Sequence, residues 1–400
     1  MRPPAAPAPG PAPLLVVAGD ASGDVMAARV VEAMGAPSTG VGGPALRAAG
    51  QRQLARAEEL SAMGFASAVL GAPRVAVALA AVVRLAARQR PRAALLVGWS
   101  EPNALLGRAL RHLGVPVLWY APPQVWAWRP SRAGRLAACA DRFAVVLPFE
   151  VALWRASGAW AEHVGHPAHD TRLEPRRALR ERLGVSAAAD AIAVLPGSRP
   201  HEVRRLLPAL LAAAAELRHR RSGAEARVLL TSALGTRALA WAQARARAAA
   251  LPVVVDGSPA MLPAFDVALA ASGTVTAECV VAGVPPVVAW RGDSISYGVA
   301  RRALRTRWIG LPNIALQAGA FPELVQDAAT PSALADAALE LLHDRARSDA
   351  LCREAARRLG APDATRPAER VAAMLARELG EASRPPRRPS APAPSPVGPW

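Results

Sequence analysis

The sequence predicts an α/β protein built from two Rossmann-like halves, each with its own parallel sheet. Three observations lead to this prediction. Short apolar runs alternate with helical stretches, the alternation starts again midway along the chain, and several apolar runs end in turns rich in glycine and serine. Short, continuous apolar strands between helices are typical of parallel sheets covered on both faces. We therefore expect two domains of this class in the 400-residue chain.

The first domain is expected to span residues 14–170. Its expected strands, each a short apolar run, are Leu14–Ala18, Ala93–Val97, Val115–Tyr120 and Arg142–Leu147. Helical stretches follow the first two strands, at Val25–Met34 and Ala104–Leu113. The segment Gly165–Pro175 is rich in His, Pro and Asp and is the expected linker to the second domain.

The second domain is expected to span residues 171–330. Its expected strands are Ala191–Leu195, Arg227–Thr231, Val253–Asp256, Val267–Ala270 and Val287–Trp290. Its expected helices are Glu202–Arg220, 235–250 and Thr276–Ala282. Residues 331–383 are expected to be helical, and packing back on the N-terminal domain is one arrangement open to them. The tails at 1–13 and 384–400 are rich in proline and are expected to be disordered.

The charged residues narrow the classes of function. The chain has 48 basic and 31 acidic residues, a formal net charge of +17, and all of the basic residues are arginine. The lack of lysine excludes Schiff-base chemistry and a P-loop lysine, whereas arginine can bind a phosphate with two parallel hydrogen bonds. Such a basic surface suits anionic lipid. No nucleic acid is expected as a partner, because no recognisable binding module is present.

Cysteine usage and hydropathy indicate the compartment. Cys139, Cys279 and Cys352 stand far apart and form no CxxC pair, which argues against a disulfide framework or a zinc ribbon. A reduced, cytoplasmic setting fits best. The longest apolar runs, near Val75–Val83 and Leu206–Ala215, are too short to span a bilayer. We therefore expect no part of the chain to cross a membrane.

Ligands of parallel α/β sheets bind beyond the carboxyl ends of the strands, so the turns that follow strands are the candidate sites. The turn after the first strand is Gly19–Asp24, GDASGD. Its backbone N–H groups could bind an anion at a helix start. A helix start capped by Ser22 or Asp24 explains the same residues. For this turn alone the capping interpretation is favoured.

The turn Pro196–Glu202, PGSRPHE, suits a diphosphate. Gly197 and Ser198 would expose backbone N–H groups, and Arg199 could clamp the diphosphate from the side. An ordinary tight turn with a solvated arginine is equally compatible with these residues.

The turn Ala271–Glu278, ASGTVTAE, has small residues that would let a diphosphate approach the backbone. Glu278 lies one helical turn beyond Thr274, where its carboxylate could accept both hydroxyls of a ribose. Each of these two turns is common by itself. Together they predict a sugar-nucleotide site in the second domain.

Three histidines, His163, His166 and His169, invite a metal hypothesis. Their spacing needs a helix if the rings are to converge, and Gly165 and Pro167 would break one. No metal is therefore expected here.

An aromatic cluster has two interpretations. Trp119 and Tyr120 are explained by packing beside a strand end. Trp126 and Trp128, in the loop PPQVWAWR, could instead face a ligand.

Ten short motifs together resemble one family. In order along the chain they are AGDASGD (18–24), GVGGP (40–44), EELSAMGF (58–65), PPQVWAWR (122–129), VLPFE (146–150), VGHP (164–167), LPGSRPHEV (195–203), SGTVTAEC (272–279), VVAWR (287–291) and LPNI with PELVQ (311–314 and 322–326). On these motifs the chain resembles the lipid-A-disaccharide synthases, which are inverting glycosyltransferases. The resemblance covers residues 14 to about 345 and implies the glycosyltransferase-B fold, with two Rossmann-like parallel-sheet domains facing a cleft.

The resemblance also implies a reaction. The family transfers 2,3-diacylglucosamine from UDP to 2,3-diacylglucosamine 1-phosphate, which forms a β-1,6-linked disaccharide and releases UDP, and it needs no metal or other cofactor. The implied location is the cytoplasm, peripheral to the inner face of the inner membrane. Acylated substrates and an arginine-rich surface agree with that location. The oligomeric state stays open, a homodimer included.

Two departures from the family pattern concern catalysis and binding. The family has Asp-x-Pro-Asp-Phe-Asn where this chain has SEPNAL, so Ser100 replaces the family's candidate general base. A hydroxyl cannot take a proton from a sugar alcohol near neutral pH without an activator of its own. Glu101 is the favoured substitute, provided that an extended loop is re-formed, and Asp20 is a second candidate carboxylate. The family's Ala-Gly-Arg after LPN is also lost, and residues 316–318 stand there.

The expected site residues fall into three groups. The catalytic candidates are Glu101, Ser100 and Asp20. The UDP-sugar group comprises Gly197, Ser198, Arg199, Glu202, Ser272, Gly273, Thr274, Glu278 and Asn313. The acceptor group comprises Ser22, Gly23, Gln124 and Trp126. Two alternatives stay open beside the synthase: a diverged paralogue with a different acceptor, and a non-catalytic protein that binds a sugar nucleotide or lipid.

Overall fold

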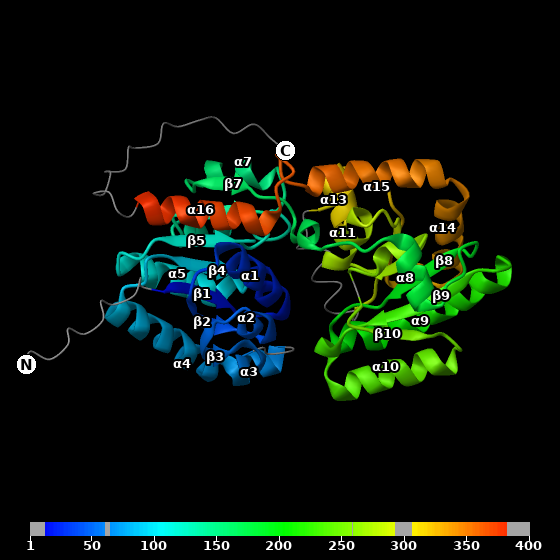
Figure 1. The fold of residues 1–400 in the computed structure, drawn as a ribbon, viewed down its shortest axis with the longest axis horizontal. Coiled ribbons are helices and arrows are strands. Elements are labelled where there is room, and N and C mark those ends of the chain that lie inside the picture. Colours follow the sequence, from blue (N-terminus) through cyan, green and yellow to red (C-terminus); the bar gives the residue numbers. More distant parts are fainter. Residues whose placement is uncertain (1–12, 61–64, 258, 293–305, 382–400) are drawn as a thin grey trace, which may run out of the picture. The chain divides into compact units, whose positions relative to one another are not determined.

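The computed structural model describes residues 13–60, 65–257, 259–292 and 306–381. Apart from Pro13, both tails expected to be disordered lie outside these residues. The chain divides into two compact units (Figure 1). The first unit comprises residues 1–125, 129–164 and 368–400, and the second comprises residues 126–128 and 165–367. The division thus follows Val164 rather than residue 170, and of the C-terminal helices only the last groups with the first unit.

The first unit contains a seven-stranded parallel sheet of order β3-β2-β1-β4-β5-β6-β7. Its strands are β1 (Leu14–Ala18), β2 (Ser38–Gly42), β3 (Arg52–Arg56), β4 (Ala94–Val97), β5 (Val117–Tyr120), β6 (Arg142–Val145) and β7 (Ala161–His163). Its helices are α1 (Ala21–Met34), α2 (Pro44–Ala48), α3 (Ala57–Leu60), α4 (Phe65–Gln89), α5 (Ser100–His112), a 3-10 turn (Pro130–Arg132), α6 (Ala133–Ala137), α7 (Glu150–Ala156) and α16 (Pro367–Glu381).

The second unit contains a six-stranded parallel sheet of order β10-β9-β8-β11-β12-β13. Its strands are β8 (Ala191–Leu195), β9 (Glu225–Leu230), β10 (Val253–Val255), β11 (Val267–Ala271), β12 (Pro286–Trp290) and β13 (Glu323–Val325). Its α-helices are α8 (Arg176–Leu183), α9 (Pro200–Arg220), α10 (Thr236–Ala248), α11 (Thr274–Val281), α13 (Leu311–Leu316), α14 (Pro331–His343) and α15 (Arg345–Leu359). Short 3-10 helices cover Pro167–Asp170, Ser232–Leu234, Leu262–Ala264 and Gln326–Ala328.

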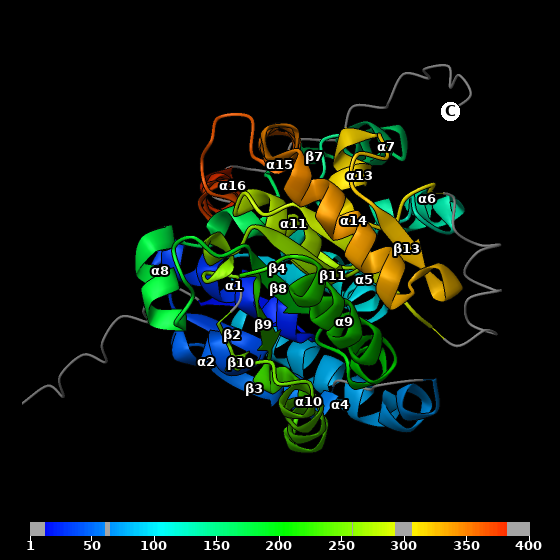
Figure 2. The ribbon, with the colours of Figure 1, turned by 90° about the vertical axis from the view of Figure 1, so that its right-hand side faces the viewer.

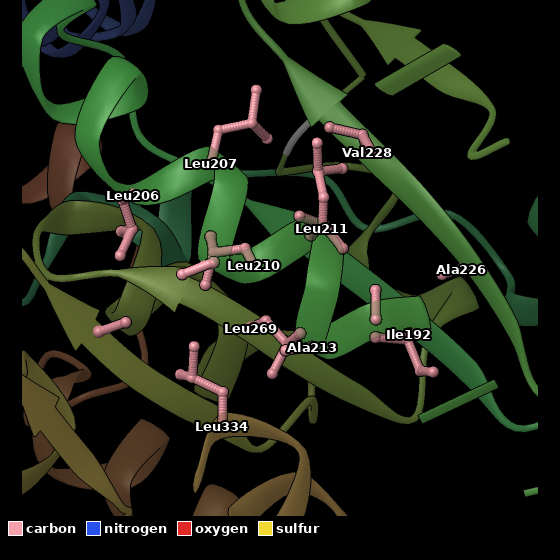
Figure 3. Close-up of a cluster of buried hydrophobic side chains, with 14 of the residues drawn as sticks. Ile192, Leu206, Leu207, Leu210, Leu211, Ala213, Ala226, Val228, Leu269 and Leu334 are labelled. Atoms are coloured by element: carbon pink, nitrogen blue, oxygen red, sulfur yellow. The ribbon is translucent and has the colours of Figure 1, made fainter. Parts of the chain in front are cut away.

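The larger core of the second unit lies between its sheet and the helices α9 and α14. Apolar residues of α9 recur at helical spacing, so Leu206 and Leu210 share the buried face (Figure 3). They pack with Ile192 of β8, Leu269 of β11 and Leu334 of α14. The helices α9 and α14 lie side by side over these strands (Figure 2). Replacing one such leucine by alanine typically costs roughly 2–5 kcal/mol, so this layer holds the sheet in place.

The last helix, α16, is tied to the first unit by ion pairs. Arg142 of β6 pairs with Glu378, and Glu162 of β7 pairs with Arg370 at 2.8 Å and Arg377 at 3.0 Å. Within the described ranges, no helix combines the length and the apolar character needed to cross a bilayer.

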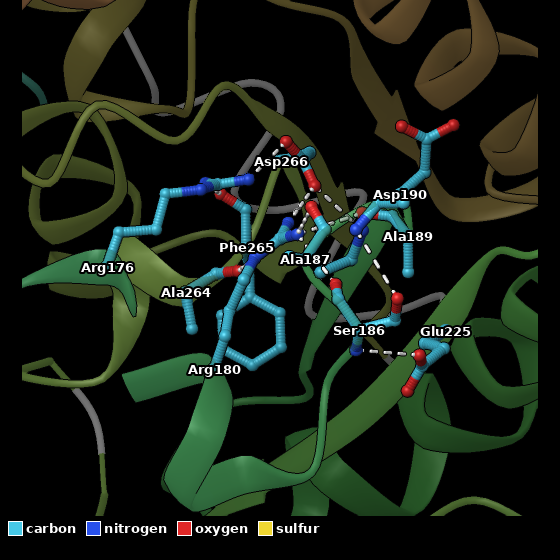
Figure 4. Close-up of polar contacts among 12 residues, drawn as sticks. Arg176, Arg180, Ser186, Ala187, Ala189, Asp190, Glu225, Ala264, Phe265 and Asp266 are labelled. Atoms are coloured by element: carbon cyan, nitrogen blue, oxygen red, sulfur yellow. Dashed lines mark hydrogen bonds and ion pairs between the residues drawn. The ribbon is translucent and has the colours of Figure 1, made fainter. Parts of the chain in front are cut away.

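A buried carboxylate, Asp266, anchors α8 and α15 to the amino edge of the second sheet. Figure 4 shows it with Arg176 and Arg180 of α8. It accepts hydrogen bonds from Arg176, Arg180 and Arg345 at 2.6–2.7 Å and from the backbone N–H of Ala191 at 2.8 Å. Burial would raise the pKa of Asp266, but the Ala191 N–H and the neighbouring arginines outweigh it and lower that pKa below 3.8. The carboxylate therefore stays charged and keeps these elements together.

Candidate active-site turns

Both sheets have a topological switch point. The strand order reverses between β1 and β4 in the first unit and between β8 and β11 in the second. Open α/β sheets bind ligands at the carboxyl ends of the strands at such a point. The four turns that follow these strands carry most of the expected site residues. Each unit is described separately below.

In the turn between β8 and α9, no side chain of the described residues comes closer than contact distance to a Cβ added at the glycine. Gly197 has φ +101, and a Cβ added there would come no closer than 3.4 Å to Ala271 or Glu202. Ser198 is exposed. Pro200 begins the helix, where its missing N–H costs no hydrogen bond. This turn can therefore present backbone N–H groups to an anion.

The charged residues of this turn form a pair. Arg199 Nη1 donates to Glu202 Oε1 at 2.8 Å, and the arginine side chain remains 67% exposed. The pair with Glu202 holds one side of the guanidinium at the helix start, while most of the Arg199 side chain stays in solvent, so both interpretations of Arg199 stay open. The remaining N–H groups of the guanidinium can meet a ligand.

The turn between β11 and α11 is also open. Gly273 has φ +153, and nothing lies within 4 Å of a Cβ added there. Thr274 is exposed, and Glu278 lies half-buried one turn further along α11. β8 and β11 pair directly, with Leu195 opposite Ala270, so the two open turns are neighbours.

The hydroxyls of Ser272, before Gly273, and of Thr276, three residues after it, form hydrogen bonds within the protein. Ser272 Oγ donates to the carbonyl of Ile309 at 2.8 Å. Thr276 Oγ1 donates to the carbonyl of Gly273 at 2.8 Å and accepts the N–H of Leu311 at 3.3 Å. These bonds attach the turn to the segment that leads into α13.

Asn313 is buried, and its amide is fully engaged. Its Nδ2 donates to Phe321 O and Glu323 Oε1, both at 2.8 Å, and its Oδ1 accepts the N–H groups of Ala320 and Phe321. Its contact with UDP stays a prediction. Glu323 was not among the expected site residues, although it stands in the PELVQ motif. Only that motif could have drawn attention to it.

Ala318 stands where the resemblance implies an arginine, and an arginine of another helix lies near this position. Gln317, just before Ala318, has φ +53. Arg358 of α15 reaches the end of α13 and donates to the carbonyl of Leu316 at 2.9 Å. Arg358 Nε also pairs with Glu354 at 2.8 Å, so the arginine beside this turn already has a carboxylate partner.

In the first unit, Asp20 caps α1. Its Oδ1 accepts the N–H of Gly23 at 2.7 Å and the hydroxyl of Ser22 at 2.8 Å. Among the residues that the structure describes, its Oδ2 accepts one bond, a long one of 3.4 Å from the N–H of Trp99. The helix start is therefore capped, as the favoured interpretation expects, but the capping residue is Asp20 and not Ser22 or Asp24.

Asp24 has a different structural role. Its buried carboxylate accepts the N–H groups of Gly43, Ala45 and Leu46 at 2.6, 2.8 and 3.2 Å, at the start of α2. The GDASGD and GVGGP motifs are thus joined by one carboxylate.

Trp99, in the turn after β4, contacts the turn after β1. It has φ +42, an uncommon conformation for a bulky residue. A Cβ on Gly19 would overlap its indole ring, so only glycine fits beneath it. A Cβ on Gly98 would lie 3.1 Å from Asp20 Oδ2. Asp20 therefore lies beside the end of β4, close to where the family's general base would start.

Ser100 and Glu101 lie in the first turn of α5, not in an extended loop as expected. Pro102 suits such a first turn, so the helix starts before the predicted Ala104. Successive side chains on a helix are about 100° apart rather than on opposite sides. Glu101 is 67% exposed and is ion-paired with Arg132. The premise that Glu101 needs a re-formed extended loop is therefore wrong.

The expected acceptor loop is partly exposed. Gln124 is exposed, Trp126 is half-buried, and Trp128 is 45% exposed. Ser22 is exposed and Gly23 is buried at the start of α1. Acceptor binding by these residues stays a prediction.

The histidines each have a separate environment. His166 is buried and caps a 3-10 turn through Nδ1, and burial lowers its pKa to about 3. His169 Nε2 lies 2.9 Å from the carbonyl of Ala356. Burial is also the main cause of the lowered pKa of His163 and His169. Within the part of the chain that the structure describes, no group of three or more His, Cys, Asp or Glu residues could hold a metal ion.

A cavity of about 340 Å³ lies in the second unit, away from these turns. Arg176, Phe265, Asp266, Pro285 and Arg345 are among its lining residues. Asp266 and Pro285 stand at the amino ends of β11 and β12, opposite the edge where the open turns lie. The cavity is therefore separate from the candidate site.

Known proteins identify the family. The model of the lipid-A-disaccharide synthetase family matches residues 14–373. A lipid-A-disaccharide synthase of Anaeromyxobacter sp. (strain K) is 39% identical over 372 residues, which cover 90% of this chain and 97% of that protein. One from Myxococcus xanthus is 36% identical, covering 82% of this chain and 87% of that protein.

Solved structures agree on the fold. A putative UDP-N-acetylglucosamine 2-epimerase from Listeria monocytogenes has a TM-score of 0.65 at 15% identity and covers 95% of this chain and 100% of its own. A spinosyn rhamnosyltransferase complexed with thymidine diphosphate has a TM-score of 0.57 at 16% identity, covering 91% and 100%. With the two parallel sheets, they confirm the predicted glycosyltransferase-B fold. The chain belongs to the lipid-A-disaccharide synthetase family.

Proposed function

We propose that the chain is an active lipid-A-disaccharide synthase. It transfers 2,3-diacylglucosamine from UDP to 2,3-diacylglucosamine 1-phosphate, forms the β-1,6 bond and releases UDP. The observation that carries this proposal is family membership over nearly the whole chain. The two neighbouring open turns at the switch point of the second unit support it, because a diphosphate needs such a backbone.

UDP is held by the second unit. The backbone at Gly197, Ser198 and Gly273 faces the diphosphate. Arg199 lies beside it, with its guanidinium hydrogen-bonded to Glu202. Ser272 and Thr274 complete the small-residue turn. Glu278, one helical turn beyond Thr274, accepts the ribose hydroxyls. Asn313 acts by holding the neighbouring segment, since its amide is already engaged.

The acceptor's 6-hydroxyl must lose its proton as the bond to UDP breaks, and we infer that Asp20 takes it. Its Oδ2 lies beside the end of β4 and, within the described part of the chain, accepts just the long bond from Trp99. Glu101 is a weaker candidate than the sequence indicates, because its carboxylate pairs with Arg132. Ser100 lacks an acidic group and serves at most to contact the acceptor. A carboxylate base contributes typically 10²–10⁴-fold to the rate.

The enzyme works at the inner face of the inner membrane as a peripheral protein, where its acylated substrates lie. Helix α4 supports this location, because Val77 is 66% exposed and Arg74, Arg84 and Arg88 are exposed on the same helix. An apolar side chain flanked by arginines suits a surface of anionic lipid.

One assay tests the activity. Purified protein receives radiolabelled 2,3-diacylglucosamine 1-phosphate and UDP-2,3-diacylglucosamine in detergent, and the lipid product is separated and counted. Labelled disaccharide with equimolar UDP is expected. Binding of UDP without any transfer would contradict the proposal and favour the non-catalytic protein. Transfer only to a different acceptor would favour the diverged paralogue.

A further inference from the structure

Glu323, the first residue of β13, bonds to the segment that holds the turn between β11 and α11. Its Oε2 accepts the N–H of Ile309 at 2.8 Å, and its Oε1 accepts the N–H of Gly310 at 3.0 Å and Asn313 Nδ2 at 2.8 Å. One carboxylate therefore ties down the backbone that leads into α13. A Cβ on Gly310 would lie 3.1 Å from Oε1, so glycine allows this close approach.

The same backbone is anchored on its other side by the turn after β11. Ile309 offers its carbonyl to Ser272 Oγ, and Leu311 offers its N–H to Thr276 Oγ1. The Thr276 hydroxyl in turn donates to the carbonyl of Gly273. Glu323 and Gly273 are thus connected through hydrogen bonds at both ends of the short backbone segment 309–311.

We infer that Glu323 is a positioning residue of the sugar-nucleotide site. It touches no ligand, and it acts by fixing segment 309–311, which fixes Ser272 and Gly273. Hydrogen bonds that a carboxylate accepts from backbone N–H groups are strong, so the segment has one favoured position. This inference rests on the proposed binding of UDP by the second unit.

The variant Glu323→Gln tests the inference. A glutamine keeps one acceptor oxygen but places an NH₂ group against an N–H donor, so one backbone bond is lost. The affinity for UDP, measured by calorimetry, is expected to fall about 10-fold, as for the loss of one charge-assisted hydrogen bond.

Glu225→Gln is the matched control. Glu225 is also the first residue of a strand, accepts the N–H of Ser186 at 3.0 Å, and lies at the amino edge of the same sheet. Its replacement is expected to leave the affinity for UDP unchanged. Equal losses of affinity in both variants would indicate a merely structural effect and overturn the inference.

A double-mutant cycle with Ser272→Ala separates positioning from general damage. If Glu323 acts through the bond between Ser272 and Ile309, the effects of the two substitutions are coupled. The fold-loss of UDP affinity in the double variant is then smaller than the product of the two single fold-losses. Fully multiplicative losses would overturn the inference. If Glu323→Gln does not fold, Thr276→Val removes the opposite anchor and is expected to weaken UDP binding similarly.

The outcomes separate the two proposals. A wild-type protein that binds UDP while Glu323→Gln binds it equally well refutes the positioning role alone. A wild-type protein that does not bind UDP at all refutes the proposed function, and the positioning role with it.

Discussion

The two switch points have the same strand order, but different groups surround the turns that follow their strands. In the second unit, Gly273 faces open space, a Cβ on Gly197 would only reach contact distance of Ala271 and Glu202, and Ser272 and Thr276 bond to the backbone beside the turn after β11. In the first unit, the indole of Trp99 covers Gly19, and Asp20 is the carboxylate beside β4. The same fold thus offers an exposed backbone at one switch point and a side-chain carboxylate at the other.

The difference suggests a division of labour. An open glycine backbone binds an anion through N–H groups and needs no particular side chain. Proton removal needs a carboxylate or another base at a fixed position. The second unit is therefore suited to the diphosphate of UDP and the first to the acceptor hydroxyl.

The largest effect is expected from Asp20→Asn. If Asp20 is the base, turnover falls by about 10²–10⁴-fold, while the affinity for UDP is unchanged because the second unit is intact. An amide still accepts the capping bonds, so the melting temperature is expected to change little. Initial rates of transfer and calorimetry with UDP check this. Turnover at the wild-type level would return the role to Glu101.

The next effect concerns stability at the opposite edge of the second sheet. Asp266→Asn leaves Arg180, whose side chain is only 6% exposed, without its charged partner. Breaking such a buried pair costs about 3 kcal/mol, which urea unfolding measures. Affinity for UDP, measured below the unfolding transition, is expected to be unchanged, since Asp266 lies away from the open turns. A stability equal to that of the wild type would contradict the anchoring role.

The same carboxylate gives a dependence on pH. The pKa of Asp266 is lowered in the folded protein below its usual 3.8. Its contribution to stability is therefore fully present above that value and is lost as the pH falls through the lower folded-state pKa. The difference in unfolding free energy between wild type and Asp266→Asn should shrink in this acidic range.

A smaller effect is expected from Arg199→Ala. It removes one charge-assisted contact to the diphosphate, typically about 1.5–3 kcal/mol, or roughly 10- to 100-fold in the affinity for UDP. Calorimetry measures it, with Arg177→Ala as a control because Arg177 is an exposed arginine of the same unit on α8. Unchanged affinity in Arg199→Ala would remove Arg199 from the site.

The smallest effect is expected from Glu101→Gln. If Asp20 is the base, turnover should change by less than about 3-fold, because Glu101 would then take no part in proton transfer and its side chain is 67% exposed. Ser100→Asp is the companion variant, and a gain in turnover there would indicate that the family's position is still the better one. A 100-fold loss in Glu101→Gln would reverse the assignment.

The sequence predicts strands well where they are continuous and apolar. The bounds of β1 and β8 are those expected, because every residue in both strands is buried. β2, with the sequence STGVG, and the edge strand β13, with ELV, were not expected, because neither has a sustained apolar pattern. Such strands form because their neighbours in the sheet hold them.

The open turns could be predicted from local composition, since glycine and serine at helix starts are visible in the sequence. The partners of the carboxylates could not. Asp24 bonds to a turn that begins at Gly43, and Glu323 to a segment that begins at Ile309, and only the folded chain brings these together. The same holds for Asp20 and Trp99, which are far apart in sequence.

Backbone hydrogen–deuterium exchange with and without UDP tests the division of labour most directly. UDP is expected to slow exchange at Gly197–Arg199 and Ser272–Thr274 in the second unit and to leave Gly19–Gly23 in the first unit unchanged. Protection at Gly19–Gly23, with none at the two turns of the second unit, would contradict the account.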